Sequence, residues 1–106
     1  CGAIKALYNP PSHEAPHVRQ WLQFASGAKL PGKVTDDLLR RTEQRSVVIQ
    51  LDRLMTFPCV ESRVKDGAIA LHGWHYIIET GDVLTFDFEH QTFIPLNGIP
   101  NTIPTP

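Results

Sequence analysis

The first residue of the chain is a cysteine, and it directly precedes a short run that is typical of a helix start. Gly2 follows Cys1, and the apolar residues of the segment 3–7 come next. The positive end of a helix dipole favours the thiolate of a cysteine placed there, and the thiolate is the form that binds metals and attacks electrophiles. Cys1 is therefore the first candidate for chemistry. Because the chain opens on this thiol and not on methionine, we expect a processed, split or truncated polypeptide.

The second cysteine, Cys59, offers less chemistry. It follows Pro58 at a predicted helix start, where we expect a small buried side chain. Two cysteines in 106 residues do not make a disulfide framework, so their number favours thiol chemistry in a reducing compartment over a bridge between Cys1 and Cys59. We therefore expect a cytoplasmic protein, with the reservation that a missing N-terminal segment would hide a targeting signal.

The histidines do not form a chelating pair. His72 and His75 stand three residues apart on a predicted strand, so their side chains are expected on opposite faces of the sheet. We expect His72 to be a structural hydrogen-bonding group, and His13, His17 and His90 to be exposed in loops or at helix starts. We therefore assign no metal site to these histidines.

Composition and charge exclude several function classes. The chain has 106 residues, of which 42% are hydrophobic and 20% charged, as in one soluble globular domain or a large piece of one. Its formal net charge is -1 with positive and negative residues interleaved, so the sequence has no basic face for nucleic acid. No apolar run approaches the ~20 residues that a membrane span needs. We expect neither a nucleic-acid nor a membrane partner.

Four helical segments must position these residues. Paired prolines after Asn9 end the first helix, and Pro16 fits the first turn of the second. Thr35 is a candidate N-cap for the third, whose apolar stripe at helical spacing indicates a packed core and not a cofactor site. The pattern leaves open whether this third segment is one helix or two. The predicted helices run to Asn9, over about 17–25, from Thr35 to near Phe57, and from Pro58 to Gly67.

A β-hairpin follows the helices. Strand-forming residues fill the segment 68–79, Thr80 and Gly81 form the turn, and the segment 83–88 forms the second strand of the hairpin. We assign only residues 92–94 to a further strand, and residues 97–106 form a proline-rich tail beyond a domain piece that ends at residue 96. An isolated hairpin is marginal in water, so we expect strands from a missing segment or from another chain beside it.

Three short motifs stand out in the sequence: Cys1-Gly2-Ala3, Gln50-Leu51 and Leu71-His72-Gly73-Trp74. Taken together with the residues around them, they resemble the carboxy-terminal half of a bacterial β-class carbonic anhydrase over about residues 1–96. The hairpin motif Leu-His-Gly-Trp and the Gln-Leu pair upstream of it are the specific ones. Two positions depart from the family's pattern, because Ser46 replaces an asparagine and Ile77 replaces an acidic residue. The matching residues are Cys1, Gly2, Ala3, Gln50, Leu51, Leu54, Thr56, Pro58, Val60, Leu71, His72, Gly73, Trp74, Tyr76, Ile78, Thr80, Gly81 and Val83.

The resemblance implies a fold, a reaction and a cofactor. The family has an α/β fold with a parallel sheet flanked by helices, to which this chain would contribute helices and a C-terminal β-hairpin but not the N-terminal strands. Its members are zinc lyases that interconvert carbon dioxide and bicarbonate, and their unit of assembly is an obligate dimer. We accordingly expect zinc as the cofactor and a homodimer or larger homo-oligomer as the assembly.

The family's zinc site matches this chain at one ligand. Cys1 corresponds to the cysteine of a His-x-x-Cys-Gly pair whose histidine would precede the chain, and the family's Cys-x-Asp-x-Arg motif has no counterpart here. The backbone N–H of Gly2 corresponds to a group beside the zinc-bound ligand that can hydrogen-bond the substrate. The resemblance therefore places the remaining ligands upstream of the chain.

Two other interpretations compete with this one. The chain is alternatively a catalytically inactive carbonic anhydrase-like folding or assembly module, or Cys1 acts as an isolated nucleophile, for which the sequence places no general base nearby.

Trp21, Trp74 and Tyr76 are expected in a core or in a dimer interface, because aromatic residues dominate burial wherever they occur.

Overall fold

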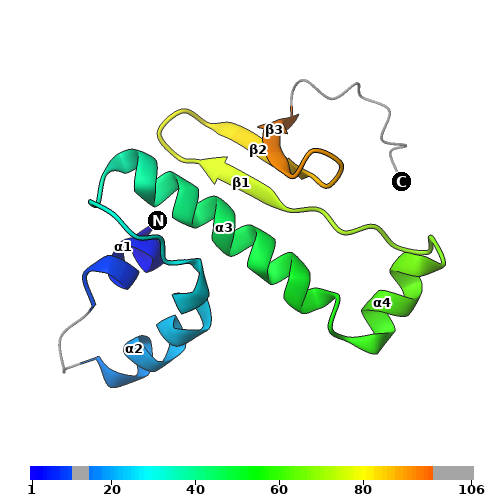
Figure 1. The fold of residues 1–106 in the computed structure, drawn as a ribbon, viewed down its shortest axis with the longest axis horizontal. Coiled ribbons are helices and arrows are strands. Elements are labelled where there is room, and N and C mark those ends of the chain that lie inside the picture. Colours follow the sequence, from blue (N-terminus) through cyan, green and yellow to red (C-terminus); the bar gives the residue numbers. More distant parts are fainter. Residues whose placement is uncertain (11–14, 97–106) are drawn as a thin grey trace. The chain divides into compact units, whose positions relative to one another are not determined.

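The computed structural model describes residues 1–10 and 15–96, which include every predicted helix and strand. The predicted proline-rich tail and His13 lie outside the described residues. The chain divides into two compact units, Cys1–Arg53 and Leu54 onward, and each is described by itself. Figure 1 shows the helices of the first unit and the hairpin of the second. None of the described helices is both long and apolar enough to cross a lipid bilayer.

The first unit is helical and opens with two short helices. Helix α1 covers Gly2–Tyr8 and helix α2 covers Pro16–Leu22, with a proline in the first turn of α2 as the sequence predicts. Ile4, Leu7 and Leu22 form the buried cluster between them, and Leu39 of the third helix packs against it. Burial of these aliphatic side chains thus holds the short helices together, since helices of this length are not stable alone.

The end of α2 differs from the prediction. The α-helix stops at Leu22 and the chain continues as a 3-10 helix, η1, over Gln23–Ala28. The hydroxyl of Ser26 donates to the carbonyl oxygen of Gln23 at 2.7 Å. Serine side chains compete in this way with α-helical backbone bonding, and a glycine follows at position 27. The predicted helix over 17–25 is therefore tightened at its C-terminal end.

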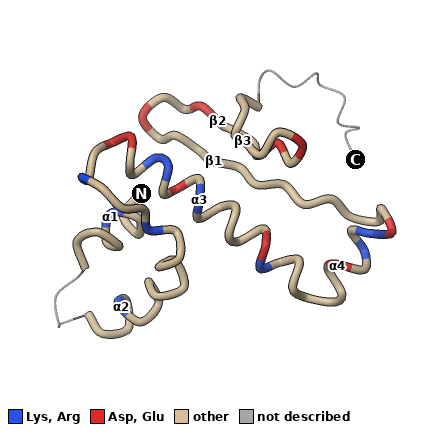
Figure 2. Tube along the Cα trace, viewed as in Figure 1, with Lys and Arg blue, Asp and Glu red and all other residues tan. Residues whose placement is uncertain are grey.

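The third helix, α3, is continuous over Asp36–Leu54, which answers the question that the sequence left open. Thr35 caps it as predicted: its Oγ1 accepts the N–H of Leu38 at 3.1 Å and its carbonyl oxygen accepts the N–H of Leu39 at 3.0 Å. The polar stretch in its middle stays helical, with Arg40, Arg41 and Arg45 exposed and Thr42 buried. Arg positions are interspersed with Asp and Glu positions along α3 (Figure 2), and Arg41 pairs with Asp37 at 2.9 Å.

The second unit joins a short helix to an antiparallel sheet. Helix α4 covers Pro58–Lys65, and Gly67 ends it with a φ of 74°, a left-handed conformation that favours glycine. The sheet has the strand order β1-β2-β3, and its strands span Trp74–Ile77, Asp82–Asp87 and Thr92–Pro95. The predicted hairpin and the third strand are confirmed. The described residues thus contain the four predicted helical segments, α1 to α4, followed by the predicted C-terminal hairpin.

The first strand is shorter than predicted. The N–H groups of Ala68 and Ile69 both donate to the carbonyl oxygen of Arg63, at 2.9 and 3.4 Å, so this segment still closes the end of α4. Pairing with β2 begins at Trp74, opposite Thr85. The N–H of Phe86 in β2 still donates to the carbonyl oxygen of Gly73 at 2.8 Å, so the strand-like segment 68–73 meets β2 only at its last residue.

The sheet carries apolar side chains on both faces. His75, Ile77 and Phe86 are buried on one face, whereas Trp74 and Tyr76 alternate with them and are exposed on the other. Trp74 retains 55% and Tyr76 58% of its accessible surface. Of the two places expected for these aromatics, their exposure excludes a core among the described residues, and a dimer interface stays a prediction.

The Thr35 cap gives a direct test of this fold. We expect Thr35→Ala to lower the free energy of unfolding by about 1 kcal/mol, because the N–H of Leu38 loses its acceptor. Thr35→Ser keeps the hydroxyl and should lower the free energy of unfolding by less than Thr35→Ala does. Urea unfolding measures both variants, and an equal loss for Ala and Ser would contradict the cap.

Candidate functional site

Cys1 lies at the N-cap position of α1, as the sequence predicts for a thiol at a helix start. Its carbonyl oxygen accepts the N–H of Lys5 at 3.1 Å, the first bond of the helix. The thiol makes no capping hydrogen bond to the helix, forms no disulfide and is exposed. The sulfur is therefore accessible to a metal ion or to another segment of protein.

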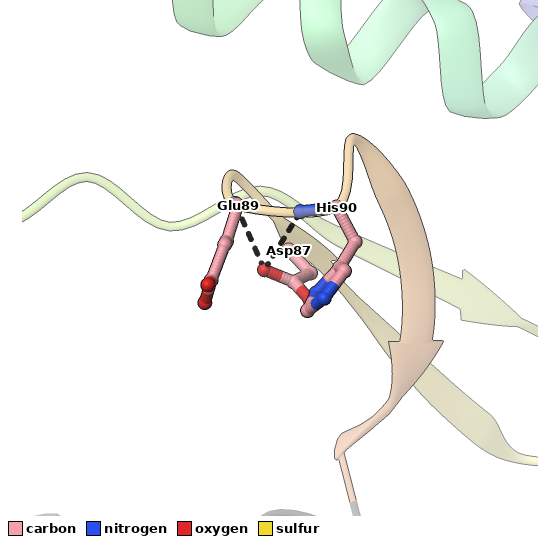
Figure 3. A group of neighbouring side chains, drawn as sticks. All are labelled: Asp87, Glu89 and His90. Carbon is pink, nitrogen blue, oxygen red and sulfur yellow. Dashed lines mark hydrogen bonds and ion pairs between the residues drawn. The ribbon is translucent and has the colours of Figure 1, made fainter.

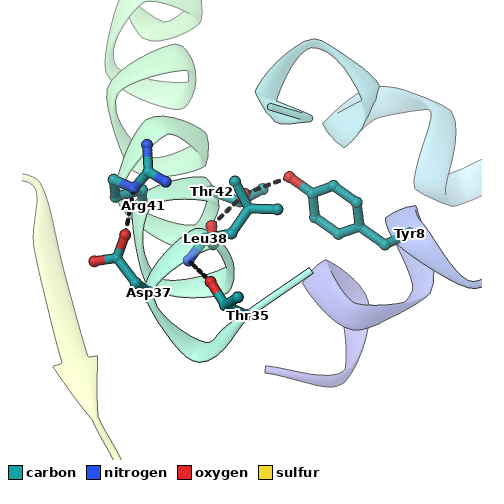
Figure 4. A network of polar contacts seen from close by, with 6 residues as sticks. All are labelled: Tyr8, Thr35, Asp37, Leu38, Arg41 and Thr42. Atoms are coloured by element: carbon teal, nitrogen blue, oxygen red, sulfur yellow. Dashed lines mark hydrogen bonds and ion pairs between the residues drawn. The ribbon is translucent and has the colours of Figure 1, made fainter. Parts of the chain in front are cut away.

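Two contacts attach α1 to α3, one at each end of the short helix. At the N-terminal end, the nitrogen of Cys1 donates to Oε2 of Glu43 at 3.2 Å. At the C-terminal end, the hydroxyls of Tyr8 and Thr42 lie 2.6 Å apart (Figure 4). Glu43 and Thr42 are neighbours in α3, so one turn of α3 fixes both ends of the helix that carries the thiol.

The sequence analysis missed Tyr8, Thr42 and Glu43. One local signal was available, because Thr42 stands four residues after Leu38 and therefore on the same face of α3 as a buried leucine. A threonine at such a position needs a polar partner inside the protein. The identity of that partner, Tyr8, depends on how the chain folds over 34 positions.

The space beside Gly2 is open. A Cβ atom added to Gly2 would meet no atom within 4 Å among the described residues. Gly2 is the first residue of α1, and the N–H groups at that position of a helix have no partner within the helix. The geometry thus offers a backbone donor next to Cys1 with room for a small molecule.

The histidines of the hairpin region lie in different environments. His72 is exposed and precedes β1, whereas His75 is 5% exposed and packs edge-on against Phe93, with ring centroids 6.2 Å apart. His72 therefore lies outside the strand on which it was expected, and that the two do not chelate one metal stays a prediction. His17 and His90 are exposed, as predicted.

Two further side chains are exposed, of which Cys59 was predicted to be buried and Trp21 to lie in a core or an interface. Cys59 is exposed, because α4 buries none of its residues in this chain. Trp21 of α2 is 63% exposed, since the helix turns Leu22 and not Trp21 toward the cluster with Ile4 and Leu7.

The described residues contain one group of three side chains that could hold a metal ion, formed by Asp87, Glu89 and His90 (Figure 3). Their ligand atoms lie within 4.8 Å of one another, in the turn between β2 and β3. Oδ1 of Asp87 accepts the N–H groups of Glu89 and His90 at 3.0 and 3.4 Å, and Oδ2 lies 2.6 Å from Nδ1 of His90. These bonds close the turn, and we assign the group to that role. Cys1 is not part of it.

The same bonds change the acidity of Asp87. The hydrogen bond with the side chain of His90, helped by the two backbone N–H groups, holds the pKa of Asp87 below its ordinary value of 3.8, against a smaller opposing effect of desolvation. A carboxylate with a lowered pKa stabilises the fold above its unfolded-state pKa, and this contribution is lost as pH falls through the folded-state pKa.

Comparison with known proteins gives consistent matches over most of the chain. The family model for carbonic anhydrase matches residues 1–83. Carbonic anhydrase 1 of Escherichia coli O157:H7 is 33% identical over 112 aligned residues, which cover 100% of this chain and 51% of that protein. A carbonic anhydrase of Synechococcus elongatus is 36% identical over 92 residues, covering 79% of this chain and 34% of the relative.

A solved structure agrees with these matches. The β-carbonic anhydrase CcaA superposes with a TM-score of 0.77 at 32% sequence identity, over 90% of this chain and 50% of that one. The chain thus spans about half the length, or less, of the relatives that it matches.

The turn that holds Asp87 predicts a pH effect. We expect His90→Ala to raise the pKa of Asp87 toward 3.8, because the largest cause of the lowering is removed. Carboxyl carbon NMR measures this pKa directly, and the free energy of unfolding of the variant should fall less than that of the unmodified chain below pH 3.8. His72→Ala, at an exposed histidine elsewhere, serves as the control. An unchanged Asp87 pKa in His90→Ala would show that the contact with His90 is absent.

Proposed function

Because this chain belongs to the β-class carbonic anhydrase family, we propose that it catalyses the zinc-dependent reversible hydration of carbon dioxide to bicarbonate as part of a complete enzyme. The observation that carries the proposal is the family match, which runs over residues 1–83 and so begins at the exposed thiol of Cys1. The similarity to CcaA in both fold and sequence supports it. The activity of the whole protein is part of the proposal, since the chain covers about half of such relatives.

Cys1 is the residue of this chain that would hold the zinc. Thiolate sulfur is a preferred ligand of zinc, and this sulfur is exposed at the start of α1. No group of three donor side chains among residues 1–10 and 15–96 includes Cys1. We propose that a histidine and a second cysteine from an upstream segment complete the ligand set. When bound, zinc supplies a Lewis acid that lowers the pKa of a water molecule to about 7.

Gly2 would contribute its backbone N–H to the substrate. The open space beside Gly2 admits carbon dioxide or bicarbonate next to the residue that carries the thiol. An N–H at the first position of a helix is free of helical bonding and can donate to a bicarbonate oxygen. The absence of a side chain at Gly2 keeps this approach open.

We also propose a cytoplasmic homodimer or larger homo-oligomer, in which residues 1–96 form part of one domain. Two cysteines that are both free and exposed favour a reducing compartment. Large apolar side chains exposed in each unit, among them Trp21, Phe24 and Trp74, favour cover by further protein.

A second candidate function is an inactive folding or assembly module of the same family. The observation that favours it is the donor set, because the described residues bring no complete group of ligands to Cys1. The two candidates differ in whether zinc binds once an upstream segment is present.

The role of Cys1 is tested in a polypeptide that joins this chain to an upstream segment carrying the remaining ligands. We expect Cys1→Ser to abolish stoichiometric zinc binding and carbon dioxide hydration, because the site loses its thiolate. Cys59→Ser is the matched control, since Cys59 is also free and exposed but lies in α4. Tight zinc binding retained in Cys1→Ser would remove Cys1 from the ligand set, and an unmodified polypeptide without zinc or activity would favour the inactive module.

The chain by itself gives a second prediction. We expect substoichiometric zinc and no hydration of carbon dioxide after dialysis, because one thiolate cannot retain the ion alone. Zinc analysis by mass spectrometry and a stopped-flow pH-indicator assay measure both quantities. A stoichiometric zinc content with activity would contradict our claim that the ligand set continues upstream.

A further inference from the structure

The contacts between α1 and α3 indicate how the proposed zinc ligand, Cys1, is held in position. We propose that Tyr8 and Thr42 are positioning residues for Cys1, and that their hydrogen bond sets the orientation of α1 and thereby the place of the thiol in the zinc site. This inference rests on the proposed function, because it concerns the same ligand. The two residues come from helices separated by 34 positions of sequence.

The directions of the hydrogen bonds follow from the partners. The Thr42 hydroxyl donates to the carbonyl oxygen of Leu38 at 2.7 Å, and a hydroxyl has a single proton to donate. Tyr8 must therefore donate to Thr42 Oγ1 across the 2.6 Å contact. The Tyr8 oxygen in turn accepts the N–H of Leu30 at 2.9 Å. The Tyr8 hydroxyl thus joins α1 both to α3 and to the loop that precedes α3.

The environment of Tyr8 leaves its side chain little freedom. Thr42 is fully buried at 0% exposure, so its oxygen has no access to water as an alternative partner. The ring of Tyr8 packs against the cluster of Ile4, Leu7 and Leu22, and the ammonium of Lys29 lies 5.6 Å from its centroid. The hydroxyl and the ring of Tyr8 are therefore both engaged.

The geometry of α1 makes this contact matter for Cys1. A helix of seven residues is about 10 Å long, so a tilt of about 5° around one end moves the other end by about 1 Å. Metal–ligand distances tolerate deviations of about 0.2 Å. The contact with Glu43 is made by the terminal ammonium of Cys1, a group that becomes a peptide N–H when an upstream segment is joined, so it is not counted as an anchor. The Tyr8 hydroxyl adds a directional contact to the apolar cluster of Ile4 and Leu7 that holds α1.

The test uses the polypeptide that joins this chain to the upstream ligands, with cobalt(II) in place of zinc as a spectroscopic probe. We expect Tyr8→Phe to weaken zinc binding by about tenfold in competition with a chelator, the usual effect of removing an outer contact that orients a ligand. The thiolate-to-cobalt absorption should change as well. Tyr76→Phe is the matched control, because it removes an exposed tyrosine hydroxyl of the hairpin and should change neither quantity.

Substitutions at Thr42 test the same hydrogen bond from its other partner, so the test does not depend on whether Tyr8→Phe folds. We expect Thr42→Val to reproduce the effect of Tyr8→Phe, and Thr42→Ser to restore normal zinc affinity, because serine keeps the hydroxyl. If Tyr8→Phe does not fold, the comparison of Ser with Val at position 42 gives the same measurement. Lower thermal stability of Tyr8→Phe and Thr42→Val with unchanged zinc affinity and cobalt absorption would overturn the positioning role. An unmodified polypeptide that binds no zinc would instead show that the proposed function itself fails.

Discussion

A fully buried hydroxyl must be hydrogen-bonded, and the hydroxyl of Thr42 in α3 meets this requirement through Leu38 and Tyr8. The placement of α1 depends on this constraint, because α1 is too short to be stable alone and shares only a small apolar cluster with α2. The Thr35 cap determines where α3 begins and so which of its residues face α1. A network of polar contacts inside the first unit therefore sets the position of the exposed thiol of Cys1.

The apolar surface of the chain fits a protein that continues beyond these residues. In both units, large hydrophobic side chains remain exposed, and on the sheet they form the face of Trp74 and Tyr76. A hairpin with a third strand can be stable in water when one apolar face is covered, but a second bare face is costly. The chain spans about half of its relatives, and we propose that the other half or a second copy covers this surface.

Local chemistry made most element boundaries predictable from sequence. Proline at helix starts, the hydroxyl of Thr35, the helix end at Gly67 and the turn at Gly81 act within a few residues, and the structure has each of them as predicted. Both glycines adopt left-handed conformations there. The 3-10 segment after α2 was not predictable in the same way, because the bond of Ser26 competes with a helix that the apolar pattern also favours.

Longer-range features could not be predicted, because sequence patterns carry no distances. A buried Cys59 and a core or interface position for Trp21 were expected from residue type, but residue type does not say which surface covers a side chain. Cys1 was found because its chemistry is visible in the sequence and the resemblance gave it a role. Tyr8 was not found, since its partner lies 34 residues away.

The central claim is that Cys1 is a zinc ligand, and zinc-edge X-ray absorption on the polypeptide with its upstream segment tests it most directly. We predict a sulfur shell at about 2.3 Å in the unmodified polypeptide and in Cys59→Ser, and the loss of a sulfur scatterer from this shell in Cys1→Ser measured with excess zinc. An identical sulfur shell in all three proteins would contradict the claim.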